Sequence, residues 1–351
     1  MTRIAQTLLC CLALASLGWT ARSQADDSSP ATTIAALNQK LGRGMNLGNA
    51  LDASHEGEWG VTLQAEYFQK IKEAGFQSVR IPIRWSAHTS AGPPWTIDPK
   101  FLERVDWAVK QALDRKLTAI INVHHFDELY AEPEKFTPQF LALWGRIAEH
   151  YGNQGEGLYF EPLNEPHDPL TAEKWNKLFA ESLAIIRKSN PTRAVIVGPG
   201  LWNNIEQLEK LKLPDDRRLI VTFHYYNPFE FTHQGAEWAA GSQQWLGKTW
   251  RATPEELAAL RKDFSKAAEW GKKNNRPIFL GEFGSYQKAD PQSRLAWTRA
   301  VAREAEKLDM SWSYWEFCAG FGAYDPITHQ WREGLRNALV DEREKPASPK
   351  P

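Results

Sequence analysis

Cysteine is scarce in this chain, which contains three in 351 residues. Cys10 and Cys11 lie in the apolar part of a predicted signal peptide, so its cleavage leaves Cys318 as the single cysteine of the mature protein. We therefore expect no internal disulfide, and we interpret Cys318 as a small apolar residue. Export without a disulfide is typical of a bacterial protein whose core is large enough to be stable by itself.

Long hydrophobic runs are also missing. No segment after the N-terminus approaches the ~20 apolar residues of a membrane helix, so we expect no membrane partner. The short apolar run at residues 8–17 follows Arg3 and precedes the small-x-small sequence Ser23-Gln24-Ala25. This pattern predicts a cleaved secretory signal peptide over residues 1–25, and hence a secreted or periplasmic protein.

Charge of one sign is not in excess, since 42 basic side chains face 43 acidic ones and the net charge is -1. This balance gives no electrostatic reason to expect nucleic acid or an anionic membrane surface as a partner. The sequence has no GxGxxG and no Walker motif, so we predict no nucleotide cofactor. Tryptophan and phenylalanine, by contrast, occur 16 times each, which suggests flat apolar surfaces for a ligand, although a large core also uses indole rings.

Apolar strand-like runs alternate with helical patterns through most of the chain. The predicted strands are residues 44–51, 78–83, 118–125, 158–163, 194–198, 219–226, 277–283 and 311–317. Several of these runs are continuously apolar, as in parallel strands that are buried on both faces. Eight βα repeats in about 310 residues predict an α/β fold with a single (β/α)8 TIM barrel, because an open doubly wound sheet would have fewer strands and a Gly-rich phosphate turn.

We expect this barrel to be one catalytic domain over residues 37–342. Residues 26–36 are predicted to be a flexible lead-in and residues 343–351 a short tail, and we expect a monomer. Helix starts are marked by a capping box at Thr253-Pro254-Glu255-Glu256. The cap-then-proline pattern repeats at Asp98-Pro99, Thr137-Pro138 and Asp290-Pro291, where we also predict helix starts.

One predicted connection, residues 227–251, is unusually long and contains Trp238, Trp245 and Trp250. A long loop at the carboxyl end of barrel strands is usually functional. Indole rings there suggest platforms on which sugar rings stack their C–H faces. The alternative, that a given tryptophan only packs the loop onto the barrel, stays open for each of the three.

The segment at residues 158–167, with the letters LYFEPLNEPH, has strand-forming residues followed by a polar pair. Proline cannot donate to a sheet ladder, so we expect the strand to stop by Pro166, with Asn164 and Glu165 at the strand end that faces the active site of a barrel. Polar or aromatic residues sit near the ends of seven of the eight strands: Asn46 and Asn49, Arg80, His124 and His125, Asn164 and Glu165, His224 and Tyr226, Glu282, and Trp315. Because buried polar groups are costly unless paired, this cluster predicts a site.

Glu165 and Glu282 define the chemistry that we expect at this site. Their strands, the fourth and the seventh, lie nearly opposite across a barrel mouth, so the two carboxyl groups can flank one substrate bond. Glycoside cleavage needs one carboxylic acid for the leaving oxygen and one carboxylate to attack or to activate water. A gap of ~5 Å gives retention and one of ~6.5–9.5 Å gives inversion, and the sequence does not measure the gap.

We predict that Glu165 is the acid/base and Glu282 the nucleophile. Arg80 and Tyr226 are expected to keep Glu282 ionised by charge and hydrogen bonding, which leaves Glu165 as the more protonated group. Asn164 is expected to bind the substrate 2-hydroxyl and His224 to orient the acid/base. Trp315 is expected to form the floor of the subsite on the non-reducing side of the cleavage point.

Seven motifs together resemble bacterial glycoside hydrolase family 5: GMNLGNALD, VRIPIRW, INVHHFDE, YFEPLNEPH, TFHYYNPFEFTHQGAEW, FLGEFG and SYWEFCAGFG. The likeness covers roughly residues 38–340 and is close to endo-β-1,4-glucanases that also accept mannan. It implies a (β/α)8 barrel, a retaining mechanism and no catalytic metal.

The resemblance also implies roles for individual residues. It places the acid/base on Glu165 and the nucleophile on Glu282. The supporting residues that it implies are Arg80, His124, Asn164, His224, Tyr226 and Trp315, and the sugar-contacting residues are Asn49, His125, His233 and Trp238. One position departs from the pattern, because Asp52 stands where close relatives often have glutamate.

The function expected is a secreted retaining endo-β-1,4-glucanase that cuts internal bonds of a β-linked polysaccharide. An endo-β-1,4-mannanase is the main alternative, because glucose and mannose differ in one hydroxyl at C2. A non-catalytic carbohydrate-binding barrel is disfavoured, since a binder needs no opposed carboxylates. A metal-dependent hydrolase is also disfavoured: His124 and His125 are adjacent in a predicted strand and would point to opposite faces.

Overall fold

The computed structural model describes residues 32–340, and the compact unit that begins at Thr33 contains the whole fold described below. The predicted signal peptide at residues 1–25 and the tail at residues 343–351 lie outside the described residues. Within residues 32–340, no helix has both the length and the apolar character needed to cross a bilayer.

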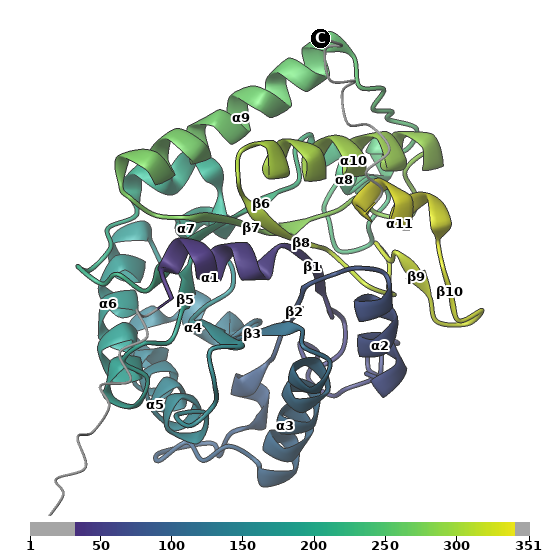
Figure 1. The fold of residues 1–351 in the computed structure, drawn as a ribbon. Helices are drawn as coiled ribbons and strands as arrows, with labels where there is room; N and C mark the ends of the chain where they lie inside the picture. The colour runs from purple at the N-terminus through teal and green to yellow at the C-terminus, as the bar shows by residue number, and fades with distance from the viewer. Residues whose placement is uncertain (1–31, 341–351) are drawn as a thin grey trace, which may run out of the picture. The chain divides into compact units, whose positions relative to one another are not determined.

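Eight parallel strands form a closed barrel in which neighbours in the sequence are neighbours in space and β8 pairs with β1. The strands are β1 (Arg43–Asn46), β2 (Ser78–Ile81), β3 (Thr118–Asn122), β4 (Leu158–Glu161), β5 (Val195–Val197), β6 (Leu219–Tyr225), β7 (Ile278–Phe283) and β8 (Ser311–Tyr314). Helices surround these strands (Figure 1). The predicted (β/α)8 barrel is therefore confirmed.

The α-helices are α1 (Ile34–Leu41), α2 (Ala65–Glu73), α3 (Pro99–Asp114), α4 (Asp127–Ala131), α5 (Pro133–His150), α6 (Ala172–Ser189), α7 (Gly200–Asn203), α8 (Phe229–Thr232), α9 (Pro254–Lys273), α10 (Pro291–Lys307) and α11 (Glu333–Val340). Three 3-10 turns, η1 (Trp85–His88), η2 (Ile205–Lys210) and η3 (Ser242–Trp245), and a small antiparallel pair, β9 (Tyr324–Asp325) and β10 (Gln330–Trp331), complete the described elements. The short elements α4, α7, α8 and η3 all follow strands, so they lie at the carboxyl end of the barrel.

The helix α1 closes the amino-terminal end of the barrel. Its Leu37 and Leu41 pack against the inward-facing side chains Ile120, Tyr159, Ile196, Ile220 and Phe279. The Tyr159 hydroxyl donates to the Leu37 carbonyl oxygen at 2.9 Å, which fixes the helix on the barrel floor. The flexible lead-in predicted over residues 26–36 is therefore wrong from Ile34 onward, because Thr33 caps a helix there: its hydroxyl accepts the Ala36 amide hydrogen at 3.2 Å.

Seven of the eight strands end earlier than the sequence predicted, and β7 ends at Phe283 as predicted. The strand β3 stops at Asn122 rather than at residue 125, and β4 stops at Glu161, because Pro162 has no N–H with which to continue the ladder. Pro162, and not Pro166, is thus the residue that ends β4. Leu163 and Phe317, which extended two of the predicted strands, are buried in loops instead.

Most of the predicted helix starts are confirmed. Thr253 forms the capping box with Glu256, and Asp98 and Asp290 cap α3 and α10. The start predicted at Thr137-Pro138 is wrong, since α5 already begins at Pro133 and carries Pro138 inside it. A proline at the first helical position occurs there too, but it is Pro133 rather than Pro138.

Candidate active site

Arg80 is the centre of the polar cluster at the carboxyl end of the barrel. It lies in β2 and is completely buried. Its Nε and Nη2 donate to the two oxygens of Glu161 at 2.6 and 2.8 Å, and Nη1 donates to Oε1 of Glu282 at 2.6 Å. The remaining donors reach Oδ1 of Asn46 at 2.9 Å and Oδ1 of Asn164 at 2.8 Å, so all five N–H groups are used.

Glu282, in β7, is 4% exposed and is held through both of its oxygens. Arg80 binds Oε1, and the Tyr226 hydroxyl donates to Oε2 at 2.9 Å. Burial raises the pKa of Glu282 above its ordinary value, while the adjacent His224 and Arg80 limit the rise. These contacts with Arg80 and Tyr226 are the ones expected from the sequence.

Glu165 lies in the loop after β4, with a left-handed backbone at φ 46°. His224 Nδ1 lies 2.6 Å from its Oε1, and Arg80 makes no direct hydrogen bond to it within the described chain. Burial raises the pKa of Glu165 to about 7, against the opposing charge of Arg80. One oxygen of Glu165, one oxygen of Glu282 and one ring nitrogen of His224 all lie within 4.8 Å of one another.

Four hydrogen bonds hold the loop that carries Glu165. The Asn164 N–H donates to the Val123 carbonyl at 2.8 Å, and Trp144 Nε1 donates to the Pro162 carbonyl at 2.9 Å. The Tyr130 hydroxyl, from α4, contacts the Asn164 carbonyl at 2.5 Å, and His167 Nδ1 lies 2.7 Å from the Glu165 carbonyl. A left-handed residue without a glycine is strained, and contacts of this kind keep it in place.

The wall of the site beside Arg80 is aromatic. Trp315, which follows β8, stacks on His124 with ring centroids 5.6 Å apart and an interplanar angle of 5°. A Cβ on Gly48 would lie 2.7 Å from the Trp315 ring, so glycine is required for this approach. The buried Glu316 accepts the backbone N–H groups of Cys318, Ala319 and Phe321 at 2.7, 2.7 and 3.0 Å and thereby fixes the loop behind the indole.

The other residues expected to contact sugar lie on the same end of the barrel but further out. Asn49 is half-buried at φ 66°, and His125 meets Trp59 edge-on at 5.4 Å. His233 is 8% exposed and lies 4.9 Å from the ring of Tyr226. Trp238 is 64% exposed and packs edge-on against Tyr286 with ring centroids 5.0 Å apart.

The long loop uses its three tryptophans differently. Trp238 is the exposed one, Trp245 is half-buried, and Trp250 is 3% exposed in the core. The platform hypothesis is therefore wrong for Trp250, which packs the loop onto the barrel. Trp245 meets the ring of Phe229 edge-on at 5.8 Å.

Asp52 is a buried residue whose two oxygens bind the loop after β1. Its Oδ2 and Oδ1 accept the backbone N–H groups of Asn49 and Ala50 at 3.0 and 2.7 Å, and the residue is 1% exposed. Burial raises the pKa of Asp52 to about 6. Its contacts are those of a residue that shapes the loop after β1.

The geometric argument against a shared metal at His124 and His125 is wrong. Because β3 ends at Asn122, the two rings lie together with centroids 4.6 Å apart, and their donor atoms and one of Asp52 lie within 4.8 Å of one another. Glu165, His224 and Glu282 form a second such group. Both oxygens of Asp52 already bind backbone N–H groups, which weakens the first group as a ligand set; the absence of a catalytic metal stays a prediction.

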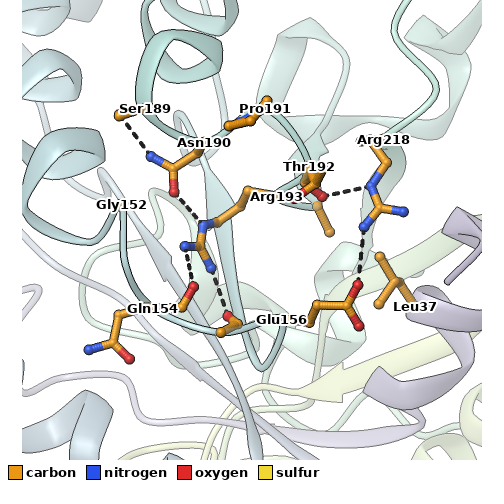
Figure 2. A pocket seen from close by; sticks show the side chains of 12 residues that line it. Leu37, Gly152, Gln154, Glu156, Ser189, Asn190, Pro191, Thr192, Arg193 and Arg218 are labelled. Carbon is orange, nitrogen blue, oxygen red and sulfur yellow. Dashed lines mark hydrogen bonds and ion pairs between the residues drawn. The ribbon is translucent and has the colours of Figure 1, made fainter. Parts of the chain in front are cut away.

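One hollow outside this cluster lies at the opposite end of the barrel, where residues that precede strands line it (Figure 2). Arg193 dominates it but has no donor left for a ligand. Its Nε binds Asn190 Oδ1, and its four remaining N–H groups bind the carbonyls of Gly155, Leu158, Tyr151 and Gln154 at 2.8–3.0 Å. This hollow is a structural feature of the barrel base.

Four residues of the site were not assigned a function from the sequence: Glu161, Tyr130, Asn203 and Glu316. Glu161 carried a signal, since it is an acidic residue inside an otherwise apolar strand. Tyr130 and Asn203 lie in short helices that no periodicity marks. Asn203 Nδ2 lies 3.2 Å from His224 Nε2, on the side of the ring opposite Glu165.

A parallel (β/α)8 barrel with one buried and one half-buried carboxyl group beside an aromatic wall is an arrangement that glycoside hydrolases use. The chain belongs to glycosyl hydrolase family 5, because the cellulase model of that family matches residues 40–320. The family resemblance drawn from the seven sequence motifs is thereby confirmed.

Characterised relatives agree with this membership. Endoglucanase H of Acetivibrio thermocellus is 40% identical over 299 residues, which cover 85% of this chain and 32% of the relative, so this chain spans less than half of that protein. Endoglucanase Cel5A of Thermotoga maritima has a crystal structure with a TM-score of 0.86 at 51% identity, covering 88% of this chain and 100% of that one. Crystal structures of that Cel5A exist in complex with cellobiose and with mannotriose.

A change of Glu165 to Gln should alter how stability depends on pH. The pKa of Glu165 is raised in the fold, from 4.5 to about 7, so its stabilising contribution is full below pH 4.5 and is lost as pH rises through about 7. Glu165→Gln has the same size but no ionisation. The free energy of unfolding of the variant minus that of the parent should therefore be higher at pH 8 than at pH 4, by up to about 3 kcal/mol.

Urea unfolding of parent and variant at both pH values measures this difference. An unchanged difference between pH 4 and pH 8 would show that the Glu165 carboxyl is not destabilised by its burial.

Proposed function

We propose that this protein is a retaining endo-β-1,4-glucanase. The observation that carries the proposal is the approach of the Glu165 and Glu282 carboxyl groups to within 4.8 Å around His224. This upper limit on the separation of one oxygen of each carboxyl group lies closer to the ~5 Å of retaining glycosidases than to the ~6.5–9.5 Å of inverting enzymes, and so supports retention. Similarity to endoglucanases supports a β-1,4-glucan as the substrate.

Glu282 is the nucleophile in this proposal. Two donors, Arg80 and Tyr226, hold its two oxygens, so the carboxylate is fixed in place and its negative charge is stabilised. Glu161 is a carboxylate of the same cluster, but both of its oxygens pair with Arg80 and it is 1% exposed. Glu161 therefore balances the charge of the arginine and does not face the substrate.

Glu165 is the acid/base. With a pKa of about 7, it holds its proton at mildly acidic pH and can give it to the leaving oxygen as Glu282 forms a bond to the anomeric carbon. The glycosidic bond breaks, and the sugar is left as an ester on Glu282. In the second step Glu165 takes a proton from water, whose oxygen attacks the anomeric carbon and releases Glu282.

The remaining residues of the cluster position the substrate. Trp315 offers an indole face beside the carboxylates on the non-reducing side, with His124 stacked behind it. The Asn164 Oδ1 accepts from Arg80, and its Nδ2, which has no hydrogen-bond partner among residues 32–340, is proposed to donate to the 2-hydroxyl. Asn49, His125, His233 and Trp238 are proposed to contact sugars further from the bond that is cut.

The mannanase alternative rests on the mannotriose complex of the Thermotoga maritima Cel5A, and we propose mannan as a second substrate. Initial rates on carboxymethyl-cellulose, barley β-glucan and mannan, measured side by side, separate the two functions. We expect the highest kcat/KM on β-glucan and a lower value on mannan. A higher value on mannan would make the protein a mannanase.

Export is proposed from the residue pattern of the N-terminus alone. The molecular mass of the protein recovered outside the cytoplasm should equal that of the chain without residues 1–25. The mass of the full-length chain there would contradict the proposed cleavage.

The two carboxyl groups can be separated by azide rescue. Glu165→Ala should lose roughly 10²–10⁴-fold in kcat because the leaving oxygen is not protonated, and Glu282→Ala should lose more because no covalent intermediate forms. Azide should restore turnover of an activated aryl cellobioside in both. It should yield the β-glycosyl azide from Glu165→Ala and the α-glycosyl azide from Glu282→Ala, which the anomeric NMR signals distinguish.

Glu209→Ala is the matched control, since Glu209 is an exposed carboxylate that pairs with Lys273 on the barrel exterior. It should keep the parent rate. If Glu282→Ala were as active as Glu209→Ala, the proposed mechanism would be wrong.

A further inference from the structure

His224 lies between two partners that use opposite nitrogens of its ring. Its Nδ1 is 2.6 Å from Oε1 of Glu165, and its Nε2 is 3.2 Å from Nδ2 of Asn203. The side chain is 2% exposed, and burial lowers the pKa of His224 to about 4. The ring is therefore neutral at mildly acidic or neutral pH, with one nitrogen that donates and one that accepts.

The two tautomers of a neutral His224 have opposite effects on Glu165. When Nδ1 carries the hydrogen, it donates to Oε1, and the proton of the carboxylic acid must sit on Oε2. No residue in the described part of the chain hydrogen-bonds to Oε2, so that proton is available to a substrate. When Nε2 carries the hydrogen, Nδ1 becomes an acceptor and draws the acid proton away from the substrate. Oε2 of Glu282, 3.6 Å from Nδ1, favours the first state by its charge, and the group next to Nε2 strengthens or opposes that preference.

Asn203 presents the donor side of its amide to Nε2. An amide nitrogen only donates, so Nε2 must accept and Nδ1 must carry the hydrogen. The other end of the amide, Oδ1, is buried and has no hydrogen-bond partner in residues 32–340. It lies so close to Gly198 that a Cβ there would be 2.0 Å from it. A flipped amide would place two N–H groups, in place of one oxygen, in this crowded position against Gly198, so the observed orientation is the favoured one.

The backbone around Asn203 is strained, and this conformation directs the Asn203 side chain toward His224. Leu201, Trp202 and Asn203 all have left-handed φ, at 57°, 61° and 53°, and only asparagine adopts that region readily. Three contacts hold this turn in place. The Trp202 N–H donates to the Pro166 carbonyl at 3.2 Å, the Trp202 ring stacks on His167 at 4.6 Å, and the backbone of Asn204 pairs with that of His224.

Strain of this kind persists where the surrounding structure over-determines it, commonly at functional sites. Here both sides of the strained turn are tied to the elements that carry Glu165 and His224. We propose that Asn203 is a positioning residue that fixes the Nδ1–H tautomer of His224 and thereby keeps the acid proton of Glu165 on the oxygen that faces the substrate.

This inference rests on the proposed function, in which Glu165 is the acid/base. In the first step the Oε2–H bond breaks and its proton goes to the leaving oxygen, while the Nδ1–H of His224 stays in place and stabilises the new carboxylate. In the second step a proton from water returns to Oε2. His224 neither gains nor loses a proton in either step.

Asn203→Gly tests the proposal directly, because glycine adopts a left-handed φ without strain and removes only the amide. Without the donor, His224 also populates the tautomer whose Nδ1 accepts the acid proton. We expect kcat/KM on barley β-glucan to fall roughly tenfold, the worth of one such hydrogen bond. The basic limb of the pH profile should move to higher pH, because the protonated form of Glu165 gains an acceptor.

A second substrate separates positioning from loss of structure. The leaving group of 2,4-dinitrophenyl β-cellobioside needs no proton, so kcat/KM for this substrate should change little in Asn203→Gly. Asn275→Gly is the matched control: Asn275 is exposed, has φ 51° and follows α9 at the other end of the barrel, so this variant should match the parent on both substrates.

Gly198→Ala gives an independent test, since the new Cβ would displace the Asn203 amide from its place. Its pH profile should resemble that of Asn203→Gly. In the double variant Gly198→Ala/Asn203→Gly, the amide with which the new Cβ would clash is absent. The losses in kcat/KM of the two single variants should therefore not add. If Gly198→Ala does not fold, the Asn203→Gly comparison decides the matter alone.

Two failures can be told apart. A parent without activity on β-glucan would refute the proposed function. An active parent whose Asn203→Gly variant keeps the pH profile, or loses kcat/KM equally on both substrates, would refute the inference about Asn203 only.

Discussion

The site depends on one buried cation. Every N–H of the Arg80 side chain donates a hydrogen bond, and each bond also fixes the residue that accepts it. The accepting residues are the carboxylates Glu161 and Glu282 and the amides Asn46 and Asn164. Burying a guanidinium carries a large desolvation penalty, and two carboxylates with good geometry offset it. Four of the eight strands and the loop after β4 are thereby connected through a single side chain. The arginine thus sets the relative positions of the groups on which the proposed chemistry relies.

The same cluster gives two carboxyl groups different surroundings. Burial raises the pKa of both, but Arg80 donates directly to Glu282 and limits the rise there, whereas Glu165, which has no hydrogen bond from Arg80, reaches a pKa of about 7. Environment, rather than residue type, therefore makes the two carboxyl groups differ. The left-handed backbone of Glu165 places its side chain opposite Glu282 although β4 has already ended, and the contacts of Tyr130, Trp144 and His167 hold that conformation.

The order of the barrel strands and the identity of the two carboxyl residues were predictable, because continuous apolar runs mark buried parallel strands and polar residues at their ends mark a site. Strand ends were not, since Leu163 and Phe317 are apolar residues buried in loops. The argument about His124 and His125 failed for the same reason: they lie beyond the strand that was assumed to separate them. The position of Asn203 beside His224 could not be predicted, because it depends on three consecutive left-handed residues that no sequence pattern signals.

The helix on the barrel floor has a consequence for the order of assembly. α1 belongs to the first stretch of the fold to be synthesised, yet its partners include Phe279 in β7, more than two hundred positions later. Contacts of such large sequence separation form late, because the loop between them must close first. The interior of the barrel therefore stays open at its base until nearly the whole chain has been made.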